Sequence, residues 1–235
     1  MSRKPHYLVF DTETGGTDVD NDPILQCFVM ITDARGEEIA SREWFIYDPE
    51  RPGSPEAAEV HGFTTEFLAE NGIDPVAALE DIRGWLLDHR DLTWIAYNAS
   101  FDLSILNAEF KRYGVTDKFG DFVENMATLY DPIILSRTHD KYKKGGHRLE
   151  TVAKRYGIEF DPDEAHSAVY DVKKTAEVAV KLAEKYGIPS KEEQKTMFRT
   201  WAVDTTAFFD KVGKVDEVTG EKIVLNPNWP LQNTV

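Results

Sequence analysis

Cysteine is nearly absent from this chain of 235 residues, in which Cys27 stands alone. A single cysteine cannot form an internal disulfide, and this one lies inside a strand-like apolar run, so we expect a small buried side chain. Proteins that fold without disulfides are typical of reducing compartments, which predicts a cytoplasmic location. The first ten residues contain no apolar segment of the kind that a secretory signal needs, and we expect no such signal.

Long hydrophobic runs are missing as well. No stretch reaches the roughly 18 apolar residues that would suggest a membrane-spanning helix, so we expect no association of that kind. With 41% hydrophobic and 29% charged residues, the composition is that of an ordinary globular protein. The length allows one full-sized domain with an appendage, or two small domains.

Positive charge is scarce, since 27 Lys and Arg residues face 42 Asp and Glu residues, for a net charge of -15. This balance argues against a protein that depends on non-specific attraction to phosphates. A solubilising acidic surface accounts for most of the excess. The negative net charge is still compatible with a nucleic-acid enzyme if metal ions and a small basic patch bind the substrate at the site.

The order of apolar patterns predicts an α/β fold. Strands are expected first and helices afterwards, an order typical of a mixed β-sheet flanked by α-helices. The expected strands are residues 7–10, a hairpin of 24–33 with 37–48, and 92–98. The expected helices are two short ones bent at Gly62, then 74–89, 102–113, 129–137, 148–156 and 169–186.

The composition changes after Gly187. We therefore expect a main domain over residues 1–187 and an accessory segment over 188–235, made of a helix, a small hairpin near Thr219 and Gly220, and a tail. Ser190 and Glu193 fit a capping box at the start of that helix. One face of the helix carries apolar side chains that would pack on the main domain or bind a partner protein. These are Met197, Phe198, Trp201, Phe208, Phe209 and Val212.

Two acidic residues follow the first apolar strand. Asp11 and Glu13 are two apart, so on an extended backbone their side chains share a face, while Thr12 points the other way and leaves its backbone nearby. Carboxylates brought together in this way suit hard cations such as Mg²⁺ or Mn²⁺. The sequence has no Cys and His cluster with zinc spacing.

A calcium loop is a second way to interpret the acidic residues near the N-terminus. Asp18, Asp20 and Asp22 have the spacing with which such a loop begins. Pro23 stands where glycine would be needed, and Val29 stands at the twelfth position in place of glutamate. We therefore reject this alternative and expect a solvated turn.

Three more residues could complete a metal site. Asp102 begins a predicted helix straight after a strand, at the rim of the sheet where sites of α/β proteins lie, although it could simply cap the helix. Asp171 falls in the first turn of the last long helix and could reach a metal. His166 precedes it and could accept a proton at neutral pH, or could be a surface or capping histidine. Together these residues permit two-metal hydrolysis of a phosphodiester.

The segments "FDTET", "NASFD" and "HSAVYD" resemble the three motifs of the DEDDh 3′–5′ exonuclease family, which includes the proofreading epsilon subunits of bacterial replicative polymerases. The resemblance covers roughly residues 6–187 and implies a ribonuclease H-like fold. It also implies two divalent cations, Mg²⁺ or Mn²⁺, held by Asp11, Glu13, Asp102 and Asp171, with His166 as general base. The tyrosine class of the family would need Tyr at position 167, where this chain has Ser167.

A fourth segment, "SPEAAEVHGFTTEFL", resembles the part of the family that lines the pocket for the terminal nucleotide. By this likeness Glu56 and His61 would contact the 3′ end, although both could be ordinary residues of a helix surface. Thr12 and Phe101 are further candidates for substrate binding, and Phe101 would stack on a base or belong to the core.

The densest basic run could hold phosphates upstream of the cleaved bond. It consists of Arg137, Lys141, Lys143, Lys144, His147 and Arg148. We therefore expect an exonuclease that acts on single-stranded 3′ ends, with DNA favoured over RNA as the substrate. The alternatives are an exoribonuclease of the same family and a polymerase-associated binding subunit, the latter favoured by the apolar helix near the C-terminus.

Overall fold

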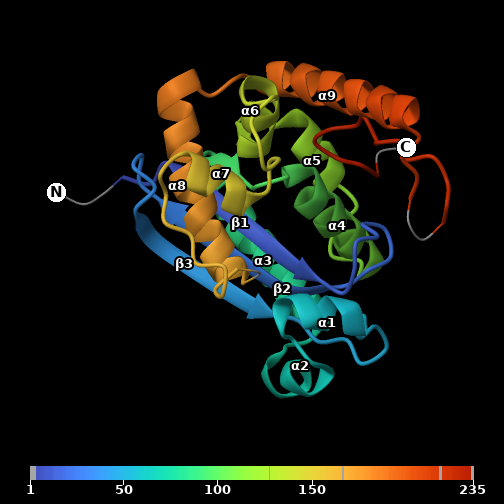
Figure 1. The fold of residues 1–235 in the computed structure, drawn as a ribbon. Helices are drawn as coiled ribbons and strands as arrows, with labels where there is room; N and C mark the ends of the chain where they lie inside the picture. The colour runs from blue at the N-terminus through green and yellow to red at the C-terminus, as the bar shows by residue number, and fades with distance from the viewer. Residues whose placement is uncertain (1–3, 127, 166, 217–218, 234–235) are drawn as a thin grey trace.

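The computed structural model describes residues 4–126, 128–165, 167–216 and 219–233. Within these ranges five strands form one mixed sheet in the order β3-β2-β1-β4-β5, covered by helices (Figure 1). The pairs β1–β2 and β2–β3 are antiparallel, whereas β1–β4 and β4–β5 are parallel. The strands are β1 (Tyr7–Thr14), β2 (Ile24–Thr32), β3 (Glu38–Phe45), β4 (Thr93–Ile95) and β5 (Leu129–Tyr130).

The predicted helices are found with some shifted ends, and α5 is a helix that the sequence did not predict. Those before β5 are α1 (Pro55–His61), α2 (Thr65–Asn71), α3 (Pro75–Asp88), α4 (Ala99–Arg112) and α5 (Phe119–Asn125). Those after it are α6 (Pro132–His139), α7 (Leu149–Arg155), α8 (Ala168–Tyr186) and α9 (Lys191–Val212). The bend between α1 and α2 is confirmed, because Gly62 ends α1 with a φ of 80°, a left-handed conformation that suits glycine.

Each face of the sheet has its own hydrophobic core, because side chains alternate along a strand. On β1, Leu8 and Phe10 pack in one core with buried residues of α3, α4 and α5. Tyr7 and Val9 pack in the other, with buried residues of α7 and α8. Cys27 of β2 is buried, as predicted. The alternation of side chains along β1 therefore determines which helices the polar residues at the end of this strand can contact.

Two helix predictions are wrong in their boundaries. The helix expected over residues 129–137 is a short strand, β5, followed by α6, because Asp131 caps α6 and Pro132 fills its first turn. The helix expected to begin at Asp102 begins at Ala99, so Asp102 is not its cap. Asn98 takes that position with a φ of 71°, a conformation that asparagine tolerates better than most residues.

The segment after Gly187 packs on the rest of the protein. The capping box of Ser190 and Glu193 at the start of α9 is confirmed. Phe198, Trp229 and Leu231 are buried in the core that α3, α4 and α5 share, whereas Phe208 remains more than half exposed. A single antiparallel bridge joins Val215 to Lys222, and part of the predicted hairpin, residues 217–218, lies outside the described residues. None of the described helices is long and apolar enough to cross a membrane.

Candidate active site

The end of β1 presents its polar side chains to two different helices. Asp11 and Glu13 continue the alternation of Tyr7 and Val9, so they face α8, and Thr12 continues that of Leu8 and Phe10. Asp11 and Glu13 are partly exposed, while Thr12 is buried. The predicted opposition of Thr12 to its two acidic neighbours is confirmed.

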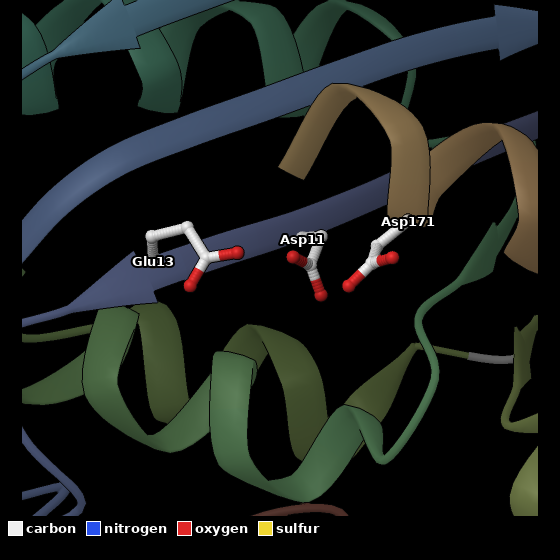
Figure 2. Close-up of side chains that lie close together, drawn as sticks. All are labelled: Asp11, Glu13 and Asp171. Atoms are coloured by element: carbon white, nitrogen blue, oxygen red, sulfur yellow. The ribbon is translucent and has the colours of Figure 1, made fainter. Parts of the chain in front are cut away.

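Asp171 meets the two carboxylates of β1 from α8. It lies in the first turn of that helix, as predicted. Figure 2 shows Glu13, Asp11 and Asp171 in a row, with Asp11 between the other two. One carboxylate oxygen of each residue lies within 4.8 Å of the others. Oxygen donors at this separation and without sulfur ligands fit a hard divalent cation such as Mg²⁺ or Mn²⁺.

Asp102 lies beside this cluster without being a member of it. Its Oδ1 accepts hydrogen bonds from the backbone N–H of Thr12 at 3.0 Å and from the Thr12 hydroxyl at 2.8 Å. The carboxylate is almost fully buried. Thr12 therefore joins the strand that carries Asp11 and Glu13 to the helix that carries Asp102, a contact across 90 positions of sequence.

The pKa values of Asp11, Glu13 and Asp102 are raised, and neighbouring carboxylates contribute for Asp11 and Glu13. Burial and the charges of Asp171 and Asp102 raise the pKa of Glu13 to about 8. Burial raises the pKa of Asp102 to about 7, against the lowering effect of the hydrogen bonds from Thr12. Asp11 also has its pKa raised, by burial first and then by Asp102, Glu13 and Asp171. Ionised carboxylates at this spacing repel one another, and bound cations would neutralise that repulsion.

Two buried polar residues that the sequence did not reveal hold these elements in place. Gln26 of β2 stands opposite Glu13 in the sheet, and its Oε1 accepts the backbone N–H of Ala168 at 3.3 Å, which fixes the start of α8. Asp131 accepts the N–H groups of Asn98 at 3.0 Å and Ala99 at 2.9 Å, which fixes the start of α4. These two contacts could not be predicted from a motif, because each joins segments far apart in the chain.

Close backbone contact also brings α1 to the end of β1. The N–H of Ser54, the residue that caps α1, donates to the carbonyl of Gly15 at 2.9 Å. A Cβ atom on Gly15 would lie only 2.9 Å from the Cα of Gly53, so glycine is needed for this approach. The start of α1 is therefore next to the strand end that carries Glu13.

The predicted substrate-binding residues lie on elements around the cluster. Glu56 is exposed on α1. His61, at the other end of that helix, is partly buried, and its Nδ1 accepts the N–H of Phe63 at 3.1 Å. Phe101 is partly buried beside Asp102 and belongs to neither hydrophobic core. The roles of Thr12, Glu56, His61 and Phe101 in binding stay predictions.

The predicted general base, His166, lies outside the described residues. The members of the predicted basic run are not equivalent. Arg137 lies on α6 with its guanidinium carbon 3.6 Å from the centre of the Trp201 ring, and Lys141 pairs with Asp204 at 3.0 Å. Lys143, Lys144 and Arg148 are exposed. The last three are therefore the members best placed to meet phosphates.

The metal-free protein is expected to lose stability as the pH rises from about pH 5 to about pH 8. In this range folded Glu13 and Asp102 retain protons that they have released in the unfolded chain, where carboxyl pKa values are roughly 4. Because the folded state binds more protons, raising the pH favours unfolding. Melting temperatures measured in EDTA across this range would test the expectation.

Mn²⁺ should restore stability at the upper end of the range, because ionised carboxylates bind cations. Glu13→Gln, which cannot ionise, serves as the control and should weaken the pH dependence in EDTA, while Asp102 still contributes. A melting temperature of the wild-type protein that stays constant or rises with pH in EDTA would contradict the expectation.

Comparison with known proteins shows the family. A family model described as an exonuclease, RNase_T, matches residues 8–179. The DNA polymerase III PolC-type of Bacillus subtilis (strain 168) is 31% identical over 177 residues, which cover 75% of this chain and 11% of that protein. The chain thus spans about a tenth of the length of this curated relative.

Solved structures share the fold. Exonuclease I of E. coli in complex with a dA16 oligonucleotide is similar with a TM-score of 0.66 and 22% identity, over 82% of this chain and 43% of that one. The Mg²⁺- and Mn²⁺-bound form of S. pombe Pop2p is similar with a TM-score of 0.60 and 18% identity, over 77% of this chain and 84% of that one. The predicted ribonuclease H-like sheet flanked by helices is confirmed. Since the family model matches most of the chain, this protein belongs to the RNase T family of DEDD 3′–5′ exonucleases.

Proposed function

We propose that this protein is a metal-dependent exonuclease that removes nucleoside monophosphates from the 3′ ends of single-stranded DNA. The observation that carries the proposal is the convergence of Asp11, Glu13 and Asp171 within 4.8 Å, with Asp102 held beside them by Thr12. Two strand residues and one helix residue, far apart in sequence, supply the donors of one hard-cation site.

The carboxylates of Asp11, Glu13 and Asp171 would hold the cations, with Asp102 as the fourth acid. Bound cations at such a site activate water and stabilise the leaving oxygen. Asp102 keeps its orientation through Thr12, so a rigid helix and strand present the ligands. His166 would take the proton of the attacking water, because a histidine with a pKa of about 6.5 is largely neutral at pH 7. A histidine in this role would place the site in the DEDDh subtype.

The 3′ end would enter beside α1. The contact of Ser54 with Gly15 brings the start of α1 to the end of β1, which supports roles for Glu56 and His61 at the terminal nucleotide. A carboxylate such as that of Glu56 can accept a hydrogen bond from a terminal hydroxyl. Phe101 is partly exposed beside Asp102, where a base could stack on it.

The loop between α6 and α7 would guide the strand upstream of the cleaved bond. Its Tyr142 is 92% exposed between the cations Lys141 and Lys143. An aromatic ring among cations suits unpaired bases and phosphates. The carbonyl of His147 accepts a hydrogen bond from the hydroxyl of Tyr97 at 2.6 Å. The loop therefore ends beside Tyr97, which lies two residues after β4, just as Asp11 lies two residues after the partner of the last β4 residue.

DNA is favoured as the substrate because PolC-type relatives are DNA polymerases and Exonuclease I was solved with a DNA oligonucleotide. The test is to incubate the protein with 5′-labelled single-stranded DNA and RNA of matched sequence, with Mg²⁺, with Mn²⁺ and with EDTA. We expect a ladder that shortens from the 3′ end, faster on DNA, and that EDTA abolishes. The same strands with a blocked 3′ hydroxyl serve as the control for direction.

Each result of this experiment has a different meaning. Faster degradation of RNA would replace the DNA proposal with that of an exoribonuclease. Degradation of the blocked strands at an equal rate would contradict the 3′–5′ direction. A folded protein that degrades neither substrate would overturn the proposal and favour a polymerase-associated binding subunit, for which the exposed Phe208 on α9 offers a contact.

A further inference from the structure

The C-terminal tail makes hydrogen bonds to the helix that carries Asp102. Trp229 and Leu231 are buried and anchor the tail. Beyond them, the N–H of Gln232 donates to the Ser104 hydroxyl at 2.7 Å, and its side-chain amide donates to the Ser100 hydroxyl at 3.2 Å. Both serines belong to α4 and are almost fully buried. The tail therefore does more than cover an apolar surface, because it also fixes the position of α4 through directed bonds.

Asn233 extends the same contact to a second element of the site. Its side-chain amide donates to the backbone carbonyl of Ser104 at 3.0 Å and to Oδ1 of Asp20 at 3.0 Å. Asp20 lies in the loop between β1 and β2, and β1 carries Asp11 and Glu13. One asparagine thus joins the helix of Asp102 to the loop that follows the other two ligands.

The first helix of the C-terminal segment supports the beginning of α4 as well. Gln194 of α9 is fully buried, and its Oε1 accepts the backbone N–H of Asp131 at 2.9 Å. Its Nε2 donates to the carbonyl of Leu129 at 2.7 Å. Asp131 in turn holds the N–H groups of Asn98 and Ala99, where α4 starts. Residues of the C-terminal segment therefore act on α4 at its first residue and along its first two turns.

These contacts lie on the opposite side of α4 from the metal ligand. Ser100 and Ser104 are each two positions from Asp102, a rotation of about 200° around the helix. Asp102 faces Thr12 of β1, so α4 is held between β1 and the tail. We propose that Gln232 and Asn233 are positioning residues, which keep α4 where the carboxylate of Asp102 can serve the metal site. The inference rests on the proposed function, and it concerns residues beyond the 8–179 that match the family model.

The test measures metal binding and does not require catalysis. The variant Q232A/N233A removes the side-chain hydrogen bonds of the tail to α4. It keeps the backbone N–H of residue 232 that donates to Ser104, and it leaves Trp229 and Leu231 in place. At a temperature where the wild-type protein and the variant are both folded, we expect Mn²⁺ to bind the variant on the order of 10-fold more weakly, as when partners that orient metal ligands are removed. The dissociation constant would be measured by titration calorimetry, and the melting temperature would be recorded in parallel.

Two controls separate positioning from a general loss of stability. I82V shortens a fully buried side chain of α3, which carries none of the four acids, and should lower the melting temperature without changing Mn²⁺ affinity. Q232A and S100A remove the same hydrogen bond from opposite ends. Their effects on Mn²⁺ affinity should therefore not add in the double variant.

Equal Mn²⁺ affinity of Q232A/N233A and the wild-type protein would overturn the inference and leave the proposed function standing. The inference would also fail if I82V and Q232A/N233A lowered the melting temperature equally and weakened Mn²⁺ binding equally. The proposed function would stand in that case too. A folded wild-type protein that binds no Mn²⁺ would overturn the inference together with the proposed function, so the two failures are distinguishable.

Discussion

Asp11→Ala is expected to remove nearly all nuclease activity while the protein stays folded. Asp11 lies between Glu13 and Asp171, so its loss takes away the central donor of the cluster (Figure 2). Bound metal ions contribute several kcal/mol of transition-state stabilisation, and a decrease in rate of ~10³-fold or more follows from losing it. The rate of degradation of labelled single-stranded DNA, measured with saturating Mg²⁺, checks this.

The same substitution should have the opposite effect on the metal-free protein. The pKa of Asp11 is raised by burial and by the charges of its acidic neighbours, so removing its carboxylate relieves both desolvation and repulsion. We expect a melting temperature in EDTA at or above that of the wild type, and a smaller increase on addition of Mn²⁺. Asp88→Ala, an exposed acid at the end of α3, is the charge-matched control and should change neither property. Activity retained by a folded Asp11→Ala protein would refute the role as metal ligand.

His166→Ala is expected to reduce turnover much more than metal affinity. A general base that takes the proton of the attacking water contributes about 10²- to 10⁴-fold to the rate and does not itself hold the metal. The decrease should appear in kcat, with little change in the Mn²⁺ dissociation constant. The limb of the pH–rate profile that protonation of this imidazole causes in the wild type should disappear in the variant.

The outcome that contradicts this role is equally specific. Equal losses of turnover and metal affinity would make His166 a residue that shapes the site without taking a proton. His6→Ala, which removes an exposed imidazole before β1, is the matched control and should leave turnover and the pH profile unchanged.

Local sequence was enough to predict those parts of the site that depend on neighbouring residues. The alternation of β1 places Asp11 and Glu13 on one face and Thr12 on the other, because successive side chains of a strand point to opposite sides. The first turn of α8 carries Asp171 for a similarly local reason, since its apolar spacing marks where the helix runs. The start of α4 near Asp102 was predicted less well, because Asp131, distant in sequence, accepts the N–H groups there. The start of α6 was also missed, although its cap Asp131 and Pro132 are local.

The contacts between these elements could be known only from the tertiary structure. Gln26 fixes α8, and Asp131 fixes α4 while Gln194 of α9 bonds to it. Each contact joins segments that are distant along the chain, so no spacing or motif announces it. The C-terminal segment was expected to be an accessory that could pack on the main domain, but its hydrogen bonds from Gln232 and Asn233 to the helix of Asp102 could not be predicted. Hydrogen bonds of this kind depend on where the hydrophobic cores bring two backbones together, and this information exists only once the chain has folded.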